Sequence, residues 1–219
     1  MSEAKPTIAI LGGTGKEGPG LALRWAAAGY KIIIGSRQAE KAEATAAELN
    51  AKLGIDTITG LENTAAARTG EISVLTVVAT AHQPALEGLK EALQGKILVD
   101  ATARVDFRAP IPPVAPAAAE IAQEVLGPGV RVVAAFQNVP AHTLKNLGET
   151  IASDVLVCAE DIEAAQQVIQ LAQDGGMRAY YAGGLANANV VEGLTSLLIS
   201  INKHYGVKSA SIGITGIEE

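Results

Sequence analysis

Three glycines at fixed spacing form the clearest chemical motif in this chain of 219 residues. Gly13, Gly15 and Gly18 fit the pattern G-x-G-x-x-G, between a β-branched run at residues 7–12 and a helical pattern at 17–29. In such a turn the first glycine permits a tight bend, the second lets the backbone approach a pyrophosphate, and the third lets helix and strand pack closely. The helix N-terminus adds free N–H groups and a partial positive charge. The motif predicts a dinucleotide-binding site.

The end of the second predicted strand indicates which dinucleotide binds. An NAD enzyme usually carries Asp or Glu there, whereas this chain reads Gly35-Ser36-Arg37. Ser36 can donate a hydrogen bond to a 2′-phosphate, and the planar fork of Arg37 can grip it. Lys41 follows four residues later and adds a second cation on the same side. We therefore predict NADP(H); the alternative is that Arg37 and Lys41 are solvated surface charges.

The elements that must hold these residues alternate between strand and helix. Such an order is typical of right-handed βαβ units and of a parallel sheet covered on both faces. We therefore predict an α/β fold, with a Rossmann-type doubly wound parallel sheet, and assign residues 1–148 to the NADP-binding domain. Strand patterns occupy 7–12, 31–35, 57–59, 72–78, 96–100 and 130–135, and helical patterns occupy 17–29, 39–53, 63–69, 84–93 and 115–126.

A small C-terminal α/β domain is expected over residues 149–219. Strand patterns lie at 154–159, 177–182 and 209–214, and helical patterns lie at 162–174 and 186–204. The last helix has an apolar stripe, which either packs into the core or in part closes a dimer interface. The stripe consists of Val190, Val191, Leu194, Leu197, Leu198, Ile201 and Tyr205.

A proline-rich segment interrupts the alternation at residues 103–116. Four of the nine prolines lie there, so the segment can be neither helix nor central strand. Because it directly follows a strand, it lies at the carboxyl edge of the sheet, where open α/β sheets bind ligands. It is either a lid over the site or a passive connection.

Composition and charge exclude several classes of protein. The net charge is −6, with 14 basic and 14 acidic residues in 1–148 but 3 basic and 9 acidic residues in 149–219. No clustered basic surface is evident, so nucleic acid is not an expected partner. A single cysteine, Cys158, excludes an intramolecular disulfide, and no His/Cys cluster has the spacing of a zinc site. Without a signal peptide or membrane-spanning run, we expect a cytoplasmic protein.

Three histidines and one aspartate are candidates for acid–base chemistry. His82, His142 and His204 have no visible partner in the sequence, which favours capping or surface roles. His82 follows a strand end and is the one that could hydrogen-bond a ring or the lid. Asp100 is predicted to be a cap or turn acceptor, and Cys158 a small buried hydrophobe.

The segment ILGGTGKEGPGLALRWAAAGYKIIIGSRQAEKA at residues 10–42 resembles the opening of the NADPH-dependent reductases of coenzyme F420, an 8-hydroxy-5-deazaflavin. Later segments resemble the same family, so the resemblance extends over essentially the whole chain. The turn Phe136-Gln137-Asn138 and the proline-rich loop depart from the pattern. The later segments are ISVLTVV, KILVDAT, AAFQNVPA, GGLANANVVEGLTSLLISIN and IGITG.

The resemblance implies reversible hydride transfer between NADP(H) and the deazaflavin, in a compact homodimer. By position, it assigns Thr14, Lys16 and Glu17 to the phosphate turn, and Ser36, Arg37 and Lys41 to the 2′-phosphate. It places Val78 and Ala79 beside the nicotinamide, and Asn138, Val139 and Pro140 where the two rings meet. Thr195, Gly193 and the loop 102–106 are the other expected edges of the deazaflavin cleft.

Hydride transfer between two stacked rings needs little acid or base chemistry from the protein, so no catalytic side chain and no metal are predicted. Negative charge on the reduced deazaflavin could be met by backbone N–H groups near Val139 or by the Thr195 hydroxyl. Three alternatives remain: an NADPH-dependent FMN or FAD reductase, a non-catalytic NADP(H) sensor, and an NADP-dependent dehydrogenase of a small alcohol or imine. The last would need a poised proton donor.

Overall fold

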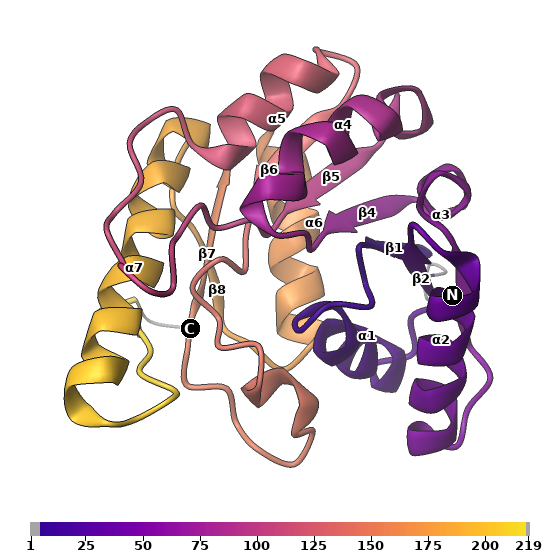
Figure 1. Cartoon of the computed structure of the whole chain (residues 1–219), viewed down its shortest axis with the longest axis horizontal. Helices are drawn as coiled ribbons and strands as arrows, with labels where there is room; N and C mark the ends of the chain where they lie inside the picture. Colours follow the sequence, from indigo (N-terminus) through magenta and orange to yellow (C-terminus); the bar gives the residue numbers. More distant parts are fainter. Residues whose placement is uncertain (1–4, 218–219) are drawn as a thin grey trace.

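The computed structural model describes residues 5–217, which form one continuous sheet of eight strands in the order β3-β2-β1-β4-β5-β6-β7-β8 (Figure 1). Strands β1 to β6 run parallel, β7 pairs antiparallel with β6, and β8 is parallel to β7. This is the predicted doubly wound α/β fold. The strands are β1 (Ile8–Leu11), β2 (Ile32–Ser36), β3 (Ile58–Glu62), β4 (Ile72–Leu75), β5 (Ile97–Asp100), β6 (Arg131–Ala134), β7 (Val155–Ala159) and β8 (Ala179–Tyr181).

Helices cover both faces of this sheet. The first face packs against α1, α2 and α6, and the second against α3, α4, α5 and α7, which gives two hydrophobic clusters. Neighbouring residues of one strand serve opposite clusters, as Ile10 and Leu11 do. The helices are α1 (Gly18–Ala27), α2 (Ala39–Leu53), α3 (Asn63–Thr69), α4 (Ala79–Leu93), α5 (Ala118–Leu126), α6 (Ile162–Asp174) and α7 (Ala188–Tyr205), with 3₁₀ turns at Thr143–Lys145 and Leu185–Asn187.

The C-terminal strands β7 and β8 extend the sheet of the N-terminal part. The buried side chains of α6 lie in the same cluster as those of α1. Because β7 is antiparallel to β6, its beginning lies at the carboxyl edge of the parallel strands, the edge at which a Rossmann fold binds its ligand. The division at residue 148 stays a prediction, and both parts contribute to this edge.

Three predicted elements differ from the structure. Strand β4 ends at Leu75 and α4 already begins at Ala79, so Pro84 lies inside the helix. Burial of Leu86 and Leu89 along α4 outweighs the backbone hydrogen bond that Pro84 cannot donate. The strand predicted at 209–214 is absent; one backbone bond, from Asp154 N–H to the Ile212 carbonyl (2.9 Å), joins this segment to the start of β7.

The predicted apolar stripe of α7 is split between two surroundings. Val191 and Leu198 are buried against the sheet, whereas Val190 and Leu197 are more than half exposed. The inner face also buries polar Glu192 and Ser196, which the stripe did not predict. Across residues 5–217, every helix is too short or too polar to span a bilayer.

Arg24 of α1 fastens the segment after β6 to the body of the fold. Its buried guanidinium donates to the carbonyls of Leu144 (2.9 Å), Gly175 (3.1 Å) and Asn146 (2.9 Å). These carbonyls belong to the 3₁₀ turn, the end of α6 and the loop that leads to β7. One side chain therefore satisfies acceptors from three segments.

Replacing Arg24 by Met should lower the free energy of unfolding by about 3 kcal/mol or more, because buried carbonyl groups lose their donors. Arg68→Met is the matched control, since Arg68 is exposed in the last turn of α3. Urea unfolding of both variants measures the difference. A loss below 1 kcal/mol in Arg24→Met would contradict this role.

Candidate functional site

The glycine turn joins β1 to α1 at the carboxyl edge of the sheet. A Cβ on Gly13 would lie 2.6 Å from the Ile10 carbonyl oxygen, and one on Gly18 would lie 2.6 Å from Gly13 Cα. A Cβ on Gly15 would meet the Gly12 carbonyl oxygen at 3.5 Å, so this exposed part of the turn has room for another group. The left-handed bend falls at Gly12 (φ 71°), one residue before the glycine predicted to make it.

The start of α1 is open to an anion. Glu17 is its N-cap residue, and no side chain caps the helix. Thr14 is partly exposed and Lys16 is exposed beside it. The N-terminal N–H groups and the partial positive charge of the helix are thus available to a phosphate.

The end of β2 carries the predicted cationic site. Ser36 is buried as the last residue of the strand, and its Oγ accepts from the Gln38 N–H (3.3 Å). Arg37 and Lys41 are exposed, and within residues 5–217 neither forms an ion pair. The sheet also brings Glu62 opposite Ser36, but the Glu62 carboxylate caps α3 by accepting from Thr64 N–H (2.8 Å). Arg37 and Lys41 therefore remain available to bind an anionic group.

Glu17 has an unusual environment within the glycine turn. The residue keeps some exposure, but its carboxyl oxygen Oε1 is buried and has no hydrogen-bond partner among residues 5–217. Burial raises the pKa of this carboxyl from 4.5 to about 8. At neutral pH Glu17 is therefore mostly protonated, which keeps a negative charge away from the open start of α1.

The raised pKa makes stability depend on pH. Between about pH 4.5 and 8 the unfolded chain releases the Glu17 proton and the folded chain keeps it, so stability falls as pH rises through this window. Relative to Glu17→Gln, wild-type protein should lose on the order of 1 kcal/mol per pH unit. Urea unfolding of both proteins at pH 5, 6.5 and 8 measures this difference. Parallel profiles would show that Glu17 ionises normally.

A polar network links the ends of β5 and β6 to α4 and α7. His82 Nε2 lies 2.6 Å from Asp100 Oδ2, and both side chains are buried. Asp100 Oδ1 accepts from the Thr102 N–H (3.0 Å), which confirms Asp100 as a turn acceptor. The Asp100 carbonyl accepts from Gln137 Nε2 (2.9 Å), and the Gln137 carbonyl accepts from the Thr195 hydroxyl (2.8 Å).

Sequence reasoning missed the His82–Asp100 pair and the part played by Gln137. His82 was expected at the surface, yet it is only 3% exposed in the first turn of α4. The signal that could have found it is topological, because β4 and β5 are neighbours and both residues follow the ends of these strands. His142 and His204 are exposed, as expected, and burial raises the pKa of the Cys158 thiol to about 11.

The residues predicted around the reacting rings lie along the same edge. Val78, just before α4, is 70% exposed, and Ala79 beside it is exposed as well. Asn138 and Val139 follow β6 and are buried, and Pro140 is half-buried. Thr195 reaches this edge from α7 through its bond to Gln137. The edge thus runs from the β2 cations past the glycine turn to the β4, β5 and β6 ends.

The two donors predicted for a negatively charged ring are already used inside the protein. Val139 N–H donates to the Phe136 carbonyl (3.0 Å), and the Thr195 hydroxyl donates to the Gln137 carbonyl. That hypothesis was wrong for both groups, because the turn after β6 closes on itself and on α7. Thr195 is a positioning residue for this turn.

The proline-rich segment is fastened along α7 (Figure 1). Arg104 Nε donates to the buried Glu192 carboxylate (2.9 Å), whose other oxygen accepts from the Ala118 N–H at the start of α5 (2.6 Å). Farther along, Ser196 Oγ donates to the Ile111 carbonyl (3.0 Å). Pro112 approaches Gly193, where an added Cβ would meet it at 3.6 Å. Loop 102–106 and α7 therefore form one wall of the edge.

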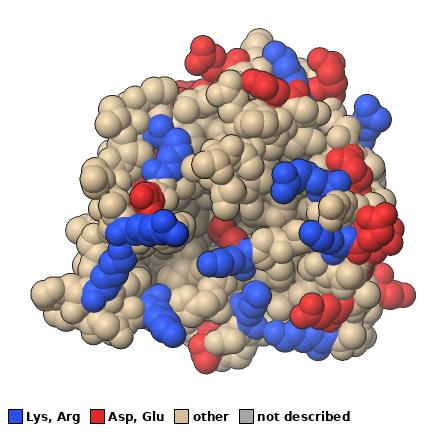
Figure 2. Space-filling view, in the orientation of Figure 1, with Lys and Arg blue, Asp and Glu red and all other residues tan. Residues whose placement is uncertain are grey.

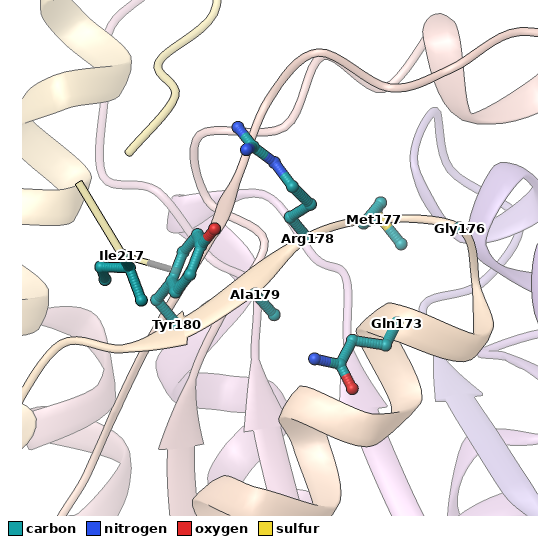
Figure 3. Close-up of a pocket in the computed structure, with 7 residues that line it drawn as sticks. All are labelled: Gln173, Gly176, Met177, Arg178, Ala179, Tyr180 and Ile217. Carbon is teal, nitrogen blue, oxygen red and sulfur yellow. The ribbon is translucent and has the colours of Figure 1, made fainter. Parts of the chain in front are cut away.

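The surface charge agrees with an anionic ligand. Figure 2 shows a hollow near the middle of one face, with several Lys and Arg side chains around it. A separate open pocket of about 630 Å³ lies at the start of β8 and includes Arg178, Tyr180 and Ile217 (Figure 3). None of the predicted cofactor-binding residues lines this pocket. We place the functional site at the carboxyl edge of the parallel strands.

Comparison with known proteins agrees with this fold and edge. The profile of the family described as "NADP oxidoreductase coenzyme F420-dependent" matches residues 7–104. The F420-dependent NADP reductase of Methanocaldococcus jannaschii is 44% identical over 223 residues, covering 96% of this chain and 99% of its own. That of Methanothermobacter thermautotrophicus is 38% identical over 222 residues, covering 97% of this chain and 96% of its own.

A solved structure is similar over the same length. A candidate F420-dependent NADP reductase from Arthrobacter sp. FB24 superimposes with a TM-score of 0.80 at 25% identity, covering 97% of this chain and 100% of that one. The similarity extends well beyond the glycine motif and includes the segments that form the carboxyl edge. This chain belongs to the family of F420-dependent NADP oxidoreductases.

Proposed function

We propose that this protein is an enzyme that transfers hydride reversibly between NADP(H) and the 8-hydroxy-5-deazaflavin coenzyme F420. The observation that carries the proposal is the match, over nearly the full length of both chains, to proteins named F420-dependent NADP reductase. The two cofactors supply the hydride donor and the hydride acceptor. The protein supplies binding, orientation and exclusion of water.

The residues present fit NADP(H). Gly13 and Gly18 let α1 begin close beneath the turn, and Gly15 leaves room for a pyrophosphate. The uncapped start of α1, with Thr14, Lys16 and protonated Glu17, receives the phosphates. Ser36, Arg37 and Lys41 receive the 2′-phosphate. Because the Glu62 carboxylate is turned to cap α3, charge repulsion at this end is small.

We assign the second ring to the other half of the edge. Exposed Val78 and Ala79 form an apolar wall after β4, and Val139 and Pro140 form one after β6. An apolar wall on each side favours stacked planar rings and excludes water from the atoms that exchange hydride. Loop 102–106 and α7, with Thr195 and Gly193, close the deazaflavin side. Residues 149–219 act as a small domain that completes this cleft.

We further propose a homodimer formed through the outer face of α7. Val190, Leu197 and Tyr205 are exposed at steps of seven and eight residues, with Leu194 and Ile201 between them on the same face. Leu197→Glu should convert the dimer to a monomer in light scattering, whereas Lys203→Glu on another face of α7 should not. A monomeric wild type would contradict the interface. A reducing cytoplasm suits the single buried Cys158.

An acceptor comparison tests the proposed reaction. Purified protein is mixed with NADPH and with the deazaflavin coenzyme, FMN or FAD, and absorbance is followed. Fast turnover selective for the deazaflavin is expected. Turnover with FMN or FAD alone would reassign the protein to the flavin reductases, and tight NADPH binding without turnover would make it a sensor.

A further inference from the structure

Two buried amide side chains follow β6, and their partners fix their orientation. Gln137 is 6% exposed and Asn138 is 3% exposed. Gln137 Nε2 donates to the Asp100 carbonyl (2.9 Å), and Asn138 Nδ2 donates to the Asp154 carbonyl (2.9 Å) and to Ser153 Oγ (3.2 Å). A carbonyl can only accept, so the NH₂ group of each amide must face it.

The amide oxygens are left without donors. Gln137 Oε1 and Asn138 Oδ1 are buried, and neither has a hydrogen-bond partner among residues 5–217. The Thr102 hydroxyl, next to Asp100, shares this condition. Most buried polar groups in proteins are paired, because leaving an acceptor unpaired costs free energy. Two adjacent residues with the same unmet need at a cofactor edge indicate a missing donor.

The turn that carries them is held in a strained conformation. Phe136 has φ 75°, a left-handed value that a bulky residue rarely adopts, and its side chain is fully buried. Its ring packs edge-on against Trp25, with centroids 5.8 Å apart. On the other side, Thr195 holds the Gln137 carbonyl. Strain maintained from several elements is typical of a binding site whose geometry is set in advance.

We propose that Gln137 and Asn138 are specificity-determining residues whose side-chain oxygens accept hydrogen bonds from an amide or imide N–H on a bound ring. The inference rests on the proposed function, which brings two such groups to this edge. One is the carboxamide of nicotinamide, and the other is the imide N–H of the deazaflavin ring. Both are planar donors, and both rings lie beside the turn that carries these residues.

The test pairs each protein variant with a ligand that lacks the donor. Dissociation constants are measured by calorimetry for NADP⁺ and its 3-acetylpyridine analogue, in which a methyl replaces the NH₂ group. They are also measured for 8-hydroxy-5-deazaflavin and its N3-methyl derivative. Wild-type protein should prefer the donor-bearing ligand of at least one pair by about tenfold. Gln137→Met or Asn138→Leu should abolish that preference.

Matched controls separate this effect from a loss of fold. Gln123 and Asn50 are amides whose oxygens already accept backbone N–H groups, from Val132 and Ile58. Gln123→Met and Asn50→Leu should therefore keep the wild-type ratio of affinities. Each ratio is taken within one protein, so a general loss of stability cancels.

The outcomes distinguish the two donors and the two proposals. A preference lost only within the NADP⁺ pair identifies the carboxamide, and one lost only within the deazaflavin pair identifies the imide. Ratios that stay unchanged in both variants would overturn the inference and leave the oxygens to buried water. If wild-type protein turns over NADPH and deazaflavin while the ratios stay unchanged, this inference alone fails. Preference coupled to NADP⁺ without turnover would make the proposed function fail alone.

Discussion

Replacing Gly18 by Ala is expected to weaken NADPH binding by about 100-fold and to lower stability by about 1–3 kcal/mol. A Cβ at this position would lie 2.6 Å from both the Cα and the carbonyl oxygen of Gly13. These are backbone atoms, so α1 must move away from the turn to admit the methyl group. The displacement pulls the helix N-terminus from the phosphates and opens the contact between helix and strand. Calorimetric titration with NADPH measures the affinity, and urea unfolding measures the stability.

Gly88→Ala is the matched control for that experiment. Gly88 lies in α4, and nothing stands within 4 Å of an added Cβ. Alanine there should raise stability by about 1 kcal/mol, through helix propensity and a less flexible unfolded chain, and should leave NADPH affinity unchanged. If Gly18→Ala bound NADPH as wild type does, the glycine turn would not be the pyrophosphate site.

Replacing Arg37 by Ala should reduce affinity for NADPH by roughly 10- to 100-fold and leave affinity for NADH unchanged. The guanidinium is exposed at the end of β2 and has no competing ion pair among the described residues, so it is free to bind the 2′-phosphate. Lys41→Ala should cause a smaller loss of the same kind, because an ammonium group binds phosphate as a point charge. The double variant should bind NADPH and NADH almost equally.

The ratio of NADPH to NADH affinity is the decisive quantity for these variants. Arg68→Ala removes an exposed cation at the far end of α3 and should leave the ratio unchanged. Raising the salt concentration should weaken the wild-type preference, because the pair is exposed and screened by ions. Equal losses for both dinucleotides in Arg37→Ala would show that Arg37 acts on the fold and not on the 2′-phosphate.

The nucleotide half of the edge could be predicted because its signals are local. The glycine spacing, the β-branched run before it and the Ser36-Arg37 pair all lie within one βαβ unit. The structure places Gly13 and Gly18 in contact and brings Ser36 to the end of β2, as those signals require. The doubly wound fold followed from the same alternation, since each parallel strand needs a crossover helix.

The second half of the edge depends on contacts that no local pattern encodes. His82 meets Asp100 across two elements, and Thr195 meets Gln137 across 58 positions of sequence. The raised pKa of Glu17 depends on burial, which the turn motif does not specify. The predicted strand at 209–214 failed because its apolar alternation is not matched by a pairing partner beyond a single backbone bond. Tertiary packing decided each of these positions.

The most direct test of the account follows one atom in a single turnover. NADPH carrying two deuterium atoms at nicotinamide C4 is mixed with excess protein and the oxidised deazaflavin in ordinary water, and the reduced deazaflavin is analysed by mass spectrometry. Direct ring-to-ring transfer predicts one deuterium in each molecule of reduced deazaflavin. Reduced deazaflavin without deuterium, or no reduction while NADPH remains bound, would contradict hydride transfer between the two cofactors at this site.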